Sequence, residues 1–329
     1  MKKPELLAPV GEKESLIAAI EAGCDAVYLS GKKYGARVYA NNFKDEELIE
    51  AIKYAHLYGV KVYVTVNTII YENEIEDFMN YIDMLHKNNV DAIIMQDIGM
   101  IDLVRKTYPN LEIHISTQMH IHNLEGAKFF ENLGIKRIVL ARETNIDIIK
   151  NIKQNTKTEI EVFVHGALCI SYSGQCLMSS LIGGRSGNRG ACAGCCRLPY
   201  DIISENKIIN KDKYPLSTKD LMTLEHIEEL IESGIDSLKI EGRMKRPEYV
   251  YQVVSLYRKA IDSYINTGKT NLTEEDIKEM KKLFNREFTS GYLFKEKYII
   301  NGKRPNHQGI EIGEVVDYKN GYIYIKLKQ

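Results

Sequence analysis

The 329-residue sequence has almost no excess of charge and no long hydrophobic run. Its 44 lysines and arginines are balanced by 45 aspartates and glutamates, so the formal net charge is -1. Without a cationic excess, any contact with nucleic acid must come from a local basic patch. The sequence has no apolar run of membrane-spanning length, and its start, MKKPELLAPVGEKE, lacks the apolar stretch of a secretory signal. We therefore expect a cytoplasmic protein without a membrane partner.

Two hydrolase motifs are also missing from the sequence. It has neither the His-Glu-x-x-His zinc motif nor the Gly-x-Ser-x-Gly nucleophile elbow. Cys169 with His165 could still form a nucleophile and base, but a cysteine peptidase would not explain the other thiols nearby. These absences weaken a peptidase interpretation.

Cysteine is scarce outside one segment of the chain. Five of the six cysteines lie within it: Cys169, Cys176, Cys192, Cys195 and Cys196. Disulfide bonds are rare in a reducing cytoplasm, and ordinary core packing would scatter the thiols. Such a local density is typical of metal binding or redox chemistry.

Eight short β-branched runs alternate with amphipathic helical patterns. They begin at Pro4, Asp25, Val60, Asp91, Glu112, Lys136, Glu159 and Asp236. Strands that are each followed by a helix predict an α/β fold, a (β/α)8 TIM-type barrel. The eighth run starts 77 positions after the seventh. We therefore predict a barrel domain over residues 1–265, with a Cys-rich insertion at about 166–215 over the barrel mouth.

Residues 266–329 are predicted to form a helical linker and the start of a small β domain. Asn320-Gly321 between two apolar runs predicts a hairpin turn. Two strands alone are marginally stable. We expect this tail either to pack on the barrel or to begin a β domain that is incomplete in this chain.

The cysteine spacing is compatible with more than one metal. Cys169, Cys176, Cys192 and Cys196 supply four thiolates, the number that saturates a 4Fe-4S cluster. Neighbouring side chains diverge, so only one of Cys195 and Cys196 should be a ligand. Cys192 and Cys195 instead have the knuckle spacing of a structural zinc site. Reduced, packed thiols without metal are a third interpretation, which the local density disfavours.

The candidate site residues lie at predicted strand ends and in the insertion. Histidine titrates near neutrality, which suits acid-base chemistry. Arginines on a Gly-rich loop can fork onto phosphates or carboxylates. Alternate residues on strand eight should share one side, where they either pair with one another or bind substrate. The predicted catalytic residues are His165, His114 and Glu241, and the predicted substrate-binding residues are Gln118, Arg185, Arg189, Arg197, Lys239 and Arg243.

Residues 161–179, EVFVHGALCISYSGQCLMS, resemble the signature of the collagenase-like peptidase family, peptidase family U32. Further similarities are LLAPVG at Leu6, HISTQ at His114, NRGACAGCCR at Asn188, LKIEGRMK at Leu238 and FNREFTSGYL at Phe284. Members mostly carry Gln-Pro-Cys-Arg where this chain has Gly194-Cys195-Cys196-Arg197, which aligns Cys196 with the family cysteine. The resemblance covers nearly the whole chain.

The resemblance implies two different chemistries. Some members are named collagen-degrading peptidases, whereas others are implicated in oxygen-independent hydroxylation of a tRNA uridine, an rRNA cytidine or a ubiquinone precursor. For the latter it implies a cysteine-held 4Fe-4S cluster and prephenate, a small dicarboxylate, as oxygen donor. We expect an RNA hydroxylase that forms 5-hydroxyuridine in tRNA, because a loop base is easier to unstack than a duplex base. The alternatives are a collagenase-like peptidase and a zinc-stapled RNA- or partner-binding module.

Overall fold

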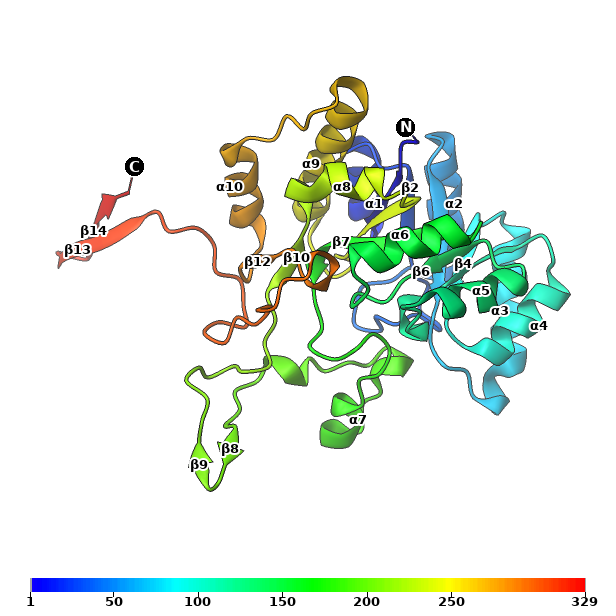
Figure 1. Cartoon of the computed structure of the whole chain (residues 1–329), viewed down its shortest axis with the longest axis horizontal. Helices are drawn as coiled ribbons and strands as arrows, with labels where there is room; N and C mark the ends of the chain where they lie inside the picture. The colour runs from blue at the N-terminus through cyan, green and yellow to red at the C-terminus, as the bar shows by residue number, and fades with distance from the viewer. Residues whose placement is uncertain (1, 329) are drawn as a thin grey trace.

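The computed structural model describes residues 2–328 and confirms the predicted parallel barrel (Figure 1). The barrel strands are β1 (Glu5–Pro9), β2 (Ala26–Leu29), β3 (Lys61–Val66), β4 (Ala92–Met95), β5 (Glu112–Ile115), β6 (Arg137–Val139), β7 (Glu159–Ala167) and β11 (Ser237–Ile240). Consecutive strands pair in parallel, and β11 pairs with both β1 and β7. These last pairings close the sheet, so the carboxyl ends of the strands converge at one mouth.

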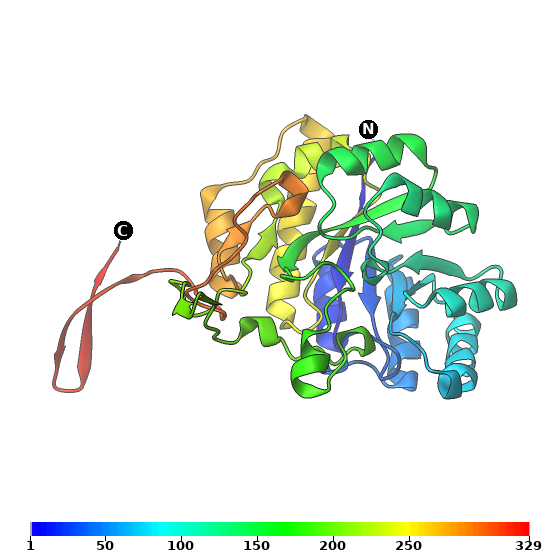
Figure 2. The same cartoon turned by 60° about the horizontal axis from the view of Figure 1, so that its bottom comes forward.

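Amphipathic helices surround the barrel, as Figure 2 shows. They are α1 (Lys13–Glu21), α2 (Asp45–Leu57), α3 (Ile75–Lys87), α4 (Ile98–Thr107), α5 (Leu124–Asn132), α6 (Ile146–Asn155), α8 (Ile227–Glu232) and α9 (Pro247–Thr267). In α9 the proline stands in the first turn, and Gly268 ends the helix at φ 72. Val253, Tyr257 and Ile261 of this helix are fully buried. Each contributes about 1.5–3 kcal/mol through burial against the neighbouring elements.

The interior of the barrel contains a layer of buried charge. Glu161 is completely buried, and its carboxylate lies 2.7 Å from Lys239 Nζ and 3.4 Å from Arg137 Nη1. Arg137 also pairs with Glu5 and Glu159. This layer closes the barrel below its mouth.

The segment between β7 and β11 is an insertion with little regular structure. It contains α7 (Met178–Gly183), the 3-10 helices Gly187–Arg189 and Cys195–Arg197, and the hairpin of β8 (Ile203–Ser204) and β9 (Lys207–Ile208). The hairpin projects away from the barrel in Figure 1. The chain then returns through β10 (Asp220–Met222), which pairs antiparallel with β7. The sequence did not predict β10, because a three-residue buried strand shows no periodicity.

The C-terminal residues divide into a packed part and a projecting part. α10 (Glu274–Leu283) leads to β12 (Phe288–Thr289), which adds to β10 as a parallel neighbour. β13 (Gly313–Lys319) and β14 (Tyr322–Leu327) form a hairpin that extends away from the barrel in both views (Figures 1 and 2). Asn320 and Gly321 make the turn with φ of 53 and 80, as the sequence predicted.

The remaining 3-10 helices are Glu72–Glu74, Thr117–Met119, Leu224–His226 and Tyr292–Phe294. Among residues 2–328, no helix combines the length and the apolar character needed to cross a membrane.

Candidate active site at the barrel mouth

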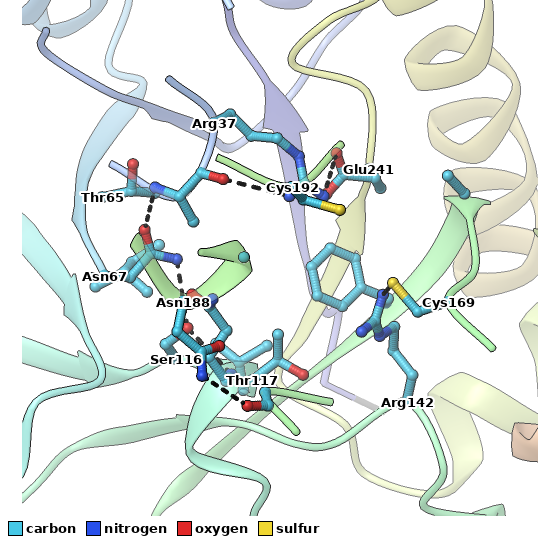
Figure 3. A pocket seen from close by; sticks show the side chains of 18 of the residues that line it. Arg37, Thr65, Asn67, Ser116, Thr117, Arg142, Cys169, Asn188, Cys192 and Glu241 are labelled. Atoms are coloured by element: carbon cyan, nitrogen blue, oxygen red, sulfur yellow. Dashed lines mark hydrogen bonds and ion pairs between the residues drawn. The ribbon is translucent and has the colours of Figure 1, made fainter. Parts of the chain in front are cut away.

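A cavity of about 140 Å³ lies at the carboxyl ends of the barrel strands, where TIM-type barrels place their active sites. Figure 3 shows an open space between two groups of side chains. One group is charged and contains Arg37, Arg142, Lys239, Glu241 and Arg243. The other carries neutral polar groups and contains Thr65, Asn67, Ser116, Thr117, Gln118 and Asn188. Cys169, Cys176 and Cys192 of the insertion also line the cavity.

The charged wall combines arginines from several elements. Arg142 follows β6, and its Nη1 lies 3.2 Å from Cys169 Sγ. The charge of Arg142 lowers the pKa of the Cys169 thiol below its ordinary value. Arg37 comes from the loop between β2 and α2, and its Nη2 lies 3.6 Å from Glu241 Oε1. This side of the cavity favours anions, including a thiolate.

Arg243 is the most unusual group in the cavity. Its side chain is only 4% exposed, and its Nη1 has no hydrogen-bond partner among residues 2–328. Burial lowers the pKa of its guanidinium to about 10. A buried charge without a partner is costly, so such a group is typical of a site that receives an anionic ligand.

The polar wall is partly fixed and partly free. Asn67 Oδ1 accepts a hydrogen bond from the Ala36 amide at 3.0 Å, and Gln96 Nε2 donates to the Asn188 carbonyl at 3.0 Å. Thr65 Oγ1 and Gln118 Oε1 are buried without a partner among the described residues. Unsatisfied groups of this kind can take hydrogen bonds from a planar polar ligand such as a nucleobase.

The cysteines gather around this mouth. Cys196 is half-buried, and burial raises the pKa of its thiol above the ordinary value. The charge of Arg197 lowers this pKa, and the charges of Cys169, Cys192 and Cys176 raise it to a smaller extent. Cys195 is buried instead, with its Sγ 3.7 Å from Ser179 Oγ of α7. The same Ser179 Oγ lies 3.9 Å from Cys192 Sγ, so Cys195 also lies near a cysteine of the cavity, and the choice of Cys196 as the fourth ligand stays a prediction.

The donor set fits a thiolate-bound metal in type and number. Four thiols on one side of the molecule match an iron-sulfur cluster, and they also match structural zinc. Within residues 2–328, no three His, Cys, Asp or Glu side chains are assembled closely enough to hold a metal ion. Metal binding would thus require the insertion to draw its sulfur atoms together.

The two predicted catalytic histidines lie outside the cavity. His165 is 1% exposed, packs beside Tyr249, Tyr257 and Phe288, and lies 3.5 Å from Tyr257 Oη through Nδ1. The β7–β11 register shifts between Lys239 and Ile240, which pair with Phe163 and His165. This bulge turns His165 toward α9, although strict alternation predicts that it points to the mouth. Its hydrogen bond goes to Tyr257 rather than to Cys169.

His114 lies in the barrel interior below the cavity. It is completely buried, its Nε2 is 2.8 Å from Glu112 Oε1, and its ring packs on Tyr63. Burial lowers its pKa. Ser116 and Gln118 do line the cavity. His114, Ser116 and Gln118 alternate in the sequence, which predicts that they share one side of the strand, but the strand ends at Ile115 and the 3-10 helix Thr117–Met119 follows.

The remaining predicted residues fall into three groups. Lys239, Glu241 and Arg243 share the cavity, as their alternation predicted, and Lys239 is paired with Glu161 below it. Arg197 donates to Ser217 Oγ at 2.8 Å and to the Leu168 carbonyl at 3.1 Å, so it anchors the insertion. The guanidinium groups of Arg185 and Arg189 lie over tyrosine rings outside the cavity.

Two arginines of the charged wall were absent from the predicted site. Arg142 lies three residues beyond β6, so its place near a strand end was a usable signal. Arg37 stands in a βα loop without a motif, and its place depends on how that loop packs against the insertion. Arg142 stood among the polar residues that the sequence placed at the strand ends, but it was given no role. Arg37 was missed, because the predicted binding arginines came from the insertion and from strand eight.

Comparison with known proteins identifies the family. The model of peptidase family U32 matches residues 11–302, so the chain belongs to this family. It is 40% identical over 300 residues to tRNA hydroxylation protein P1 of Bacillus subtilis (strain 168), covering 89% of this chain and 71% of that protein.

Two further relatives carry different names. The chain is 37% identical to the 23S rRNA 5-hydroxycytidine C2501 synthase of Escherichia coli (strain K12), over 99% of this chain and 50% of that protein. It is also 37% identical to a collagenase of Porphyromonas gingivalis (strain ATCC BAA-308 / W83), over 89% of this chain and 74% of that protein. A solved structure, the U32 peptidase Mk0906, superposes with a TM-score of 0.50 at 15% identity, covering 73% of this chain and 93% of that one. This last similarity supports the fold.

Proposed function

We propose that the protein is an RNA hydroxylase that forms 5-hydroxyuridine in tRNA, with a 4Fe-4S cluster and prephenate as an oxygen donor that replaces O₂. Relatives named for tRNA hydroxylation and for 5-hydroxycytidine synthesis support an RNA pyrimidine as substrate. Only the second name states a position on the base, and it supports C5 as the position that is modified. The soluble, cytoplasmic setting expected from the sequence belongs to this proposal.

The observation that carries the proposal is the buried, unpaired guanidinium of Arg243 in a cavity with two more arginines. A dicarboxylate donor needs two cationic anchors, and a guanidinium can bind a carboxylate through two parallel hydrogen bonds. Arg243 would bind one carboxylate, and Arg37 or Arg142 the other. Lys239 is less suited, because Glu161 already neutralises it.

The neutral wall is suited to the base. Thr65 and Gln118 offer unpaired oxygens. Asn67 is held in place by the Ala36 amide, which donates to its side chain, and Asn188 by the Gln96 side chain, which donates to its carbonyl. A uracil against this wall would present C5 toward the charged side. Glu241 is the carboxylate of that side and would accept the proton that C5 loses when a hydroxyl group replaces its hydrogen, while the donor that gives up the oxygen would take the two electrons of this oxidation.

Cys169, Cys176, Cys192 and Cys196 would hold the cluster, which supplies one-electron chemistry when bound. Anaerobic purification followed by an absorbance spectrum and by iron, sulfide and zinc analysis tests this part. Iron and sulfide with a visible chromophore are expected. A colourless protein with stoichiometric zinc would refute the cluster and favour the zinc-stapled binding module.

The reaction is tested by nucleoside mass spectrometry of tRNA from a deletion strain that lacks redundant enzymes. We expect loss of 5-hydroxyuridine derivatives, restored by the wild-type gene and by Arg105→Gln on α4, but not by Arg243→Gln. Titration calorimetry with prephenate should show about 10- to 100-fold weaker binding for Arg243→Gln, the range for a charge-assisted hydrogen bond. Unchanged tRNA in the deletion strain would refute the activity.

The peptidase alternative rests on the family name and on the relative named collagenase. The geometry gives it less support, because burial and Lys245 lower the pKa of His165 to about 3 and the ring faces α9. Gelatin cleavage that survives loss of the cysteines but not of a chosen nucleophile would favour a peptidase.

A further inference from the structure

Two half-exposed tyrosines stand beside the cavity, each under an arginine of the insertion. Tyr39 is 55% exposed and lies in the loop between β2 and α2, with Arg185 Cζ 4.7 Å from its ring centre. Tyr71 is 56% exposed and lies between β3 and α3, with Arg189 Cζ 4.1 Å from its ring centre. Both tyrosines therefore belong to βα loops, on the side of the barrel where the cavity opens.

The insertion fixes the second stack firmly. Arg189 donates to both carboxylate oxygens of Glu74 at 2.6 Å and to the Ile69 carbonyl at 2.7 Å. These bonds hold the guanidinium plane over Tyr71 and neutralise its charge. Between the two arginines in sequence lie Gly187 and Asn188, which line the cavity. The two stacks are thus connected to the cavity wall by one short segment.

The first stack opens onto a cationic groove. A cavity of about 230 Å³ is lined by Tyr39, by the three cationic residues Arg243, Lys245 and Arg246, and by one acidic residue, Glu12, among others. Arg243 lines this groove and the deep cavity, so the two spaces meet at its side chain. Among residues 2–328, Arg185 has no carboxylate partner within ion-pair distance, so its charge is available to a phosphate.

Such surfaces are typical of proteins that bind single-stranded nucleic acid. Aromatic rings accept the face of any base, while neighbouring cations follow the backbone. A base that enters a deep cavity leaves its neighbours unstacked, and those neighbours need new stacking partners. A peptide partner would not require flat rings beside a cationic groove.

We infer that Tyr39 with Arg185 and Tyr71 with Arg189 are stacking platforms for the nucleotides that flank the extruded base. This inference rests on the proposed RNA substrate and adds the surface that holds the strand. The platforms position the RNA and do not touch the reacting atoms. They contribute affinity for RNA, with no effect on the reaction once RNA is bound.

The test is fluorescence anisotropy with a labelled anticodon stem-loop RNA at fixed, low salt. Tyr39→Ala and Tyr71→Ala should each weaken binding roughly 5- to 100-fold, the range measured for loss of one base-stacking side chain. Tyr39→Phe and Tyr71→Phe retain the ring and should bind as the wild type does. Tyr58→Ala is the exposure-matched control, since Tyr58 is 60% exposed just beyond the end of α2 and lines neither the deep cavity nor the groove.

The outcomes separate this inference from the proposed function. RNA binding that falls with the alanine variants but not with the controls supports the platforms even if no hydroxylation occurs. Wild-type affinity in both alanine variants, with melting temperatures unchanged, would overturn the inference even if tRNA hydroxylation is intact. Loss of gelatin binding instead of RNA binding would also overturn it, in favour of a protein partner. In steady-state assays, the alanine variants should raise KM for RNA and leave kcat unchanged.

Discussion

The completely buried carboxylate of Glu161 should be a major determinant of stability. Burial alone would raise the pKa of Glu161, but the charges of Lys239 and Arg137 lower it below its ordinary value. Glu161→Gln leaves the ammonium group of Lys239 buried without its counterion, since Lys239 is only 4% exposed. Removing one partner of a buried ion pair costs about 3–5 kcal/mol. We expect the variant to lose about 3 kcal/mol, because the glutamine can still accept a hydrogen bond.

Urea denaturation followed by circular dichroism and tyrosine fluorescence measures this loss. The double variant Glu161→Gln/Lys239→Met removes both charges and should recover most of the stability, because neither charge remains uncompensated. Asp147→Asn is the control, since the Lys295–Asp147 pair is 62% exposed on both sides and solvent screens it, so its loss should leave the stability nearly unchanged. Additive losses in the double variant would refute the argument.

Three further outcomes follow from other residues. Burial keeps the pKa of His165 near 3 in the folded protein, whereas a histidine ordinarily has a pKa of 6.5. Between these two values the unfolded chain binds one more proton than the folded protein. The free energy of unfolding of the wild type should therefore fall by about 1.4 kcal/mol per pH unit below pH 6.5. His165→Phe should reduce this slope in urea titrations between pH 7 and pH 5, and equal slopes would contradict it. Gly174→Ala places a Cβ 1.9 Å from the Gln118 carbonyl oxygen, at a residue whose φ is 75. This clash should loosen the insertion, so limited proteolysis should cut it faster. Gly183→Ala is the control, since Gly183 has open space around it and the substitution should not change the rate of cutting. Cys196→Ser should lower the iron content of anaerobically purified protein and Cys195→Ser should not; the reverse result would exchange their roles.

The barrel was predictable because its signal is local. Runs such as Lys61–Val66 are β-branched and apolar, since parallel strands are buried on both sides, and helical patterns separate them. The turn at Asn320-Gly321 was predictable for the same reason, because asparagine and glycine tolerate positive φ. The cysteine cluster was visible in the sequence for the same reason. The alternation on strand eight likewise predicted that Lys239, Glu241 and Arg243 lie together.

The rest of the site depends on long-range packing. The orientation of His165 is set by a register shift against β11, which has no signature in its own segment. Arg37 and Tyr39 come from a loop whose path is fixed by the backbone bond from Val38 to the Gly190 carbonyl. Arg243 alternates correctly from the sequence, but only the structure shows that its guanidinium is buried without a partner.

The way the insertion is tied to the barrel has a consequence for the order of folding. The bonds that hold it, such as Arg189 to Glu74 and Gln96 to Asn188, join residues 115 and 92 positions apart. Contacts of such large sequence separation form late, because closing long loops costs entropy before any contact compensates it. The pairing of β1 with β11 that closes the barrel joins residues still farther apart, such as Glu5 and Ser237. The mouth and this seam should therefore both become protected from amide hydrogen exchange late in refolding, after the consecutive βα units. A metal held by the insertion would be loaded after those units have formed.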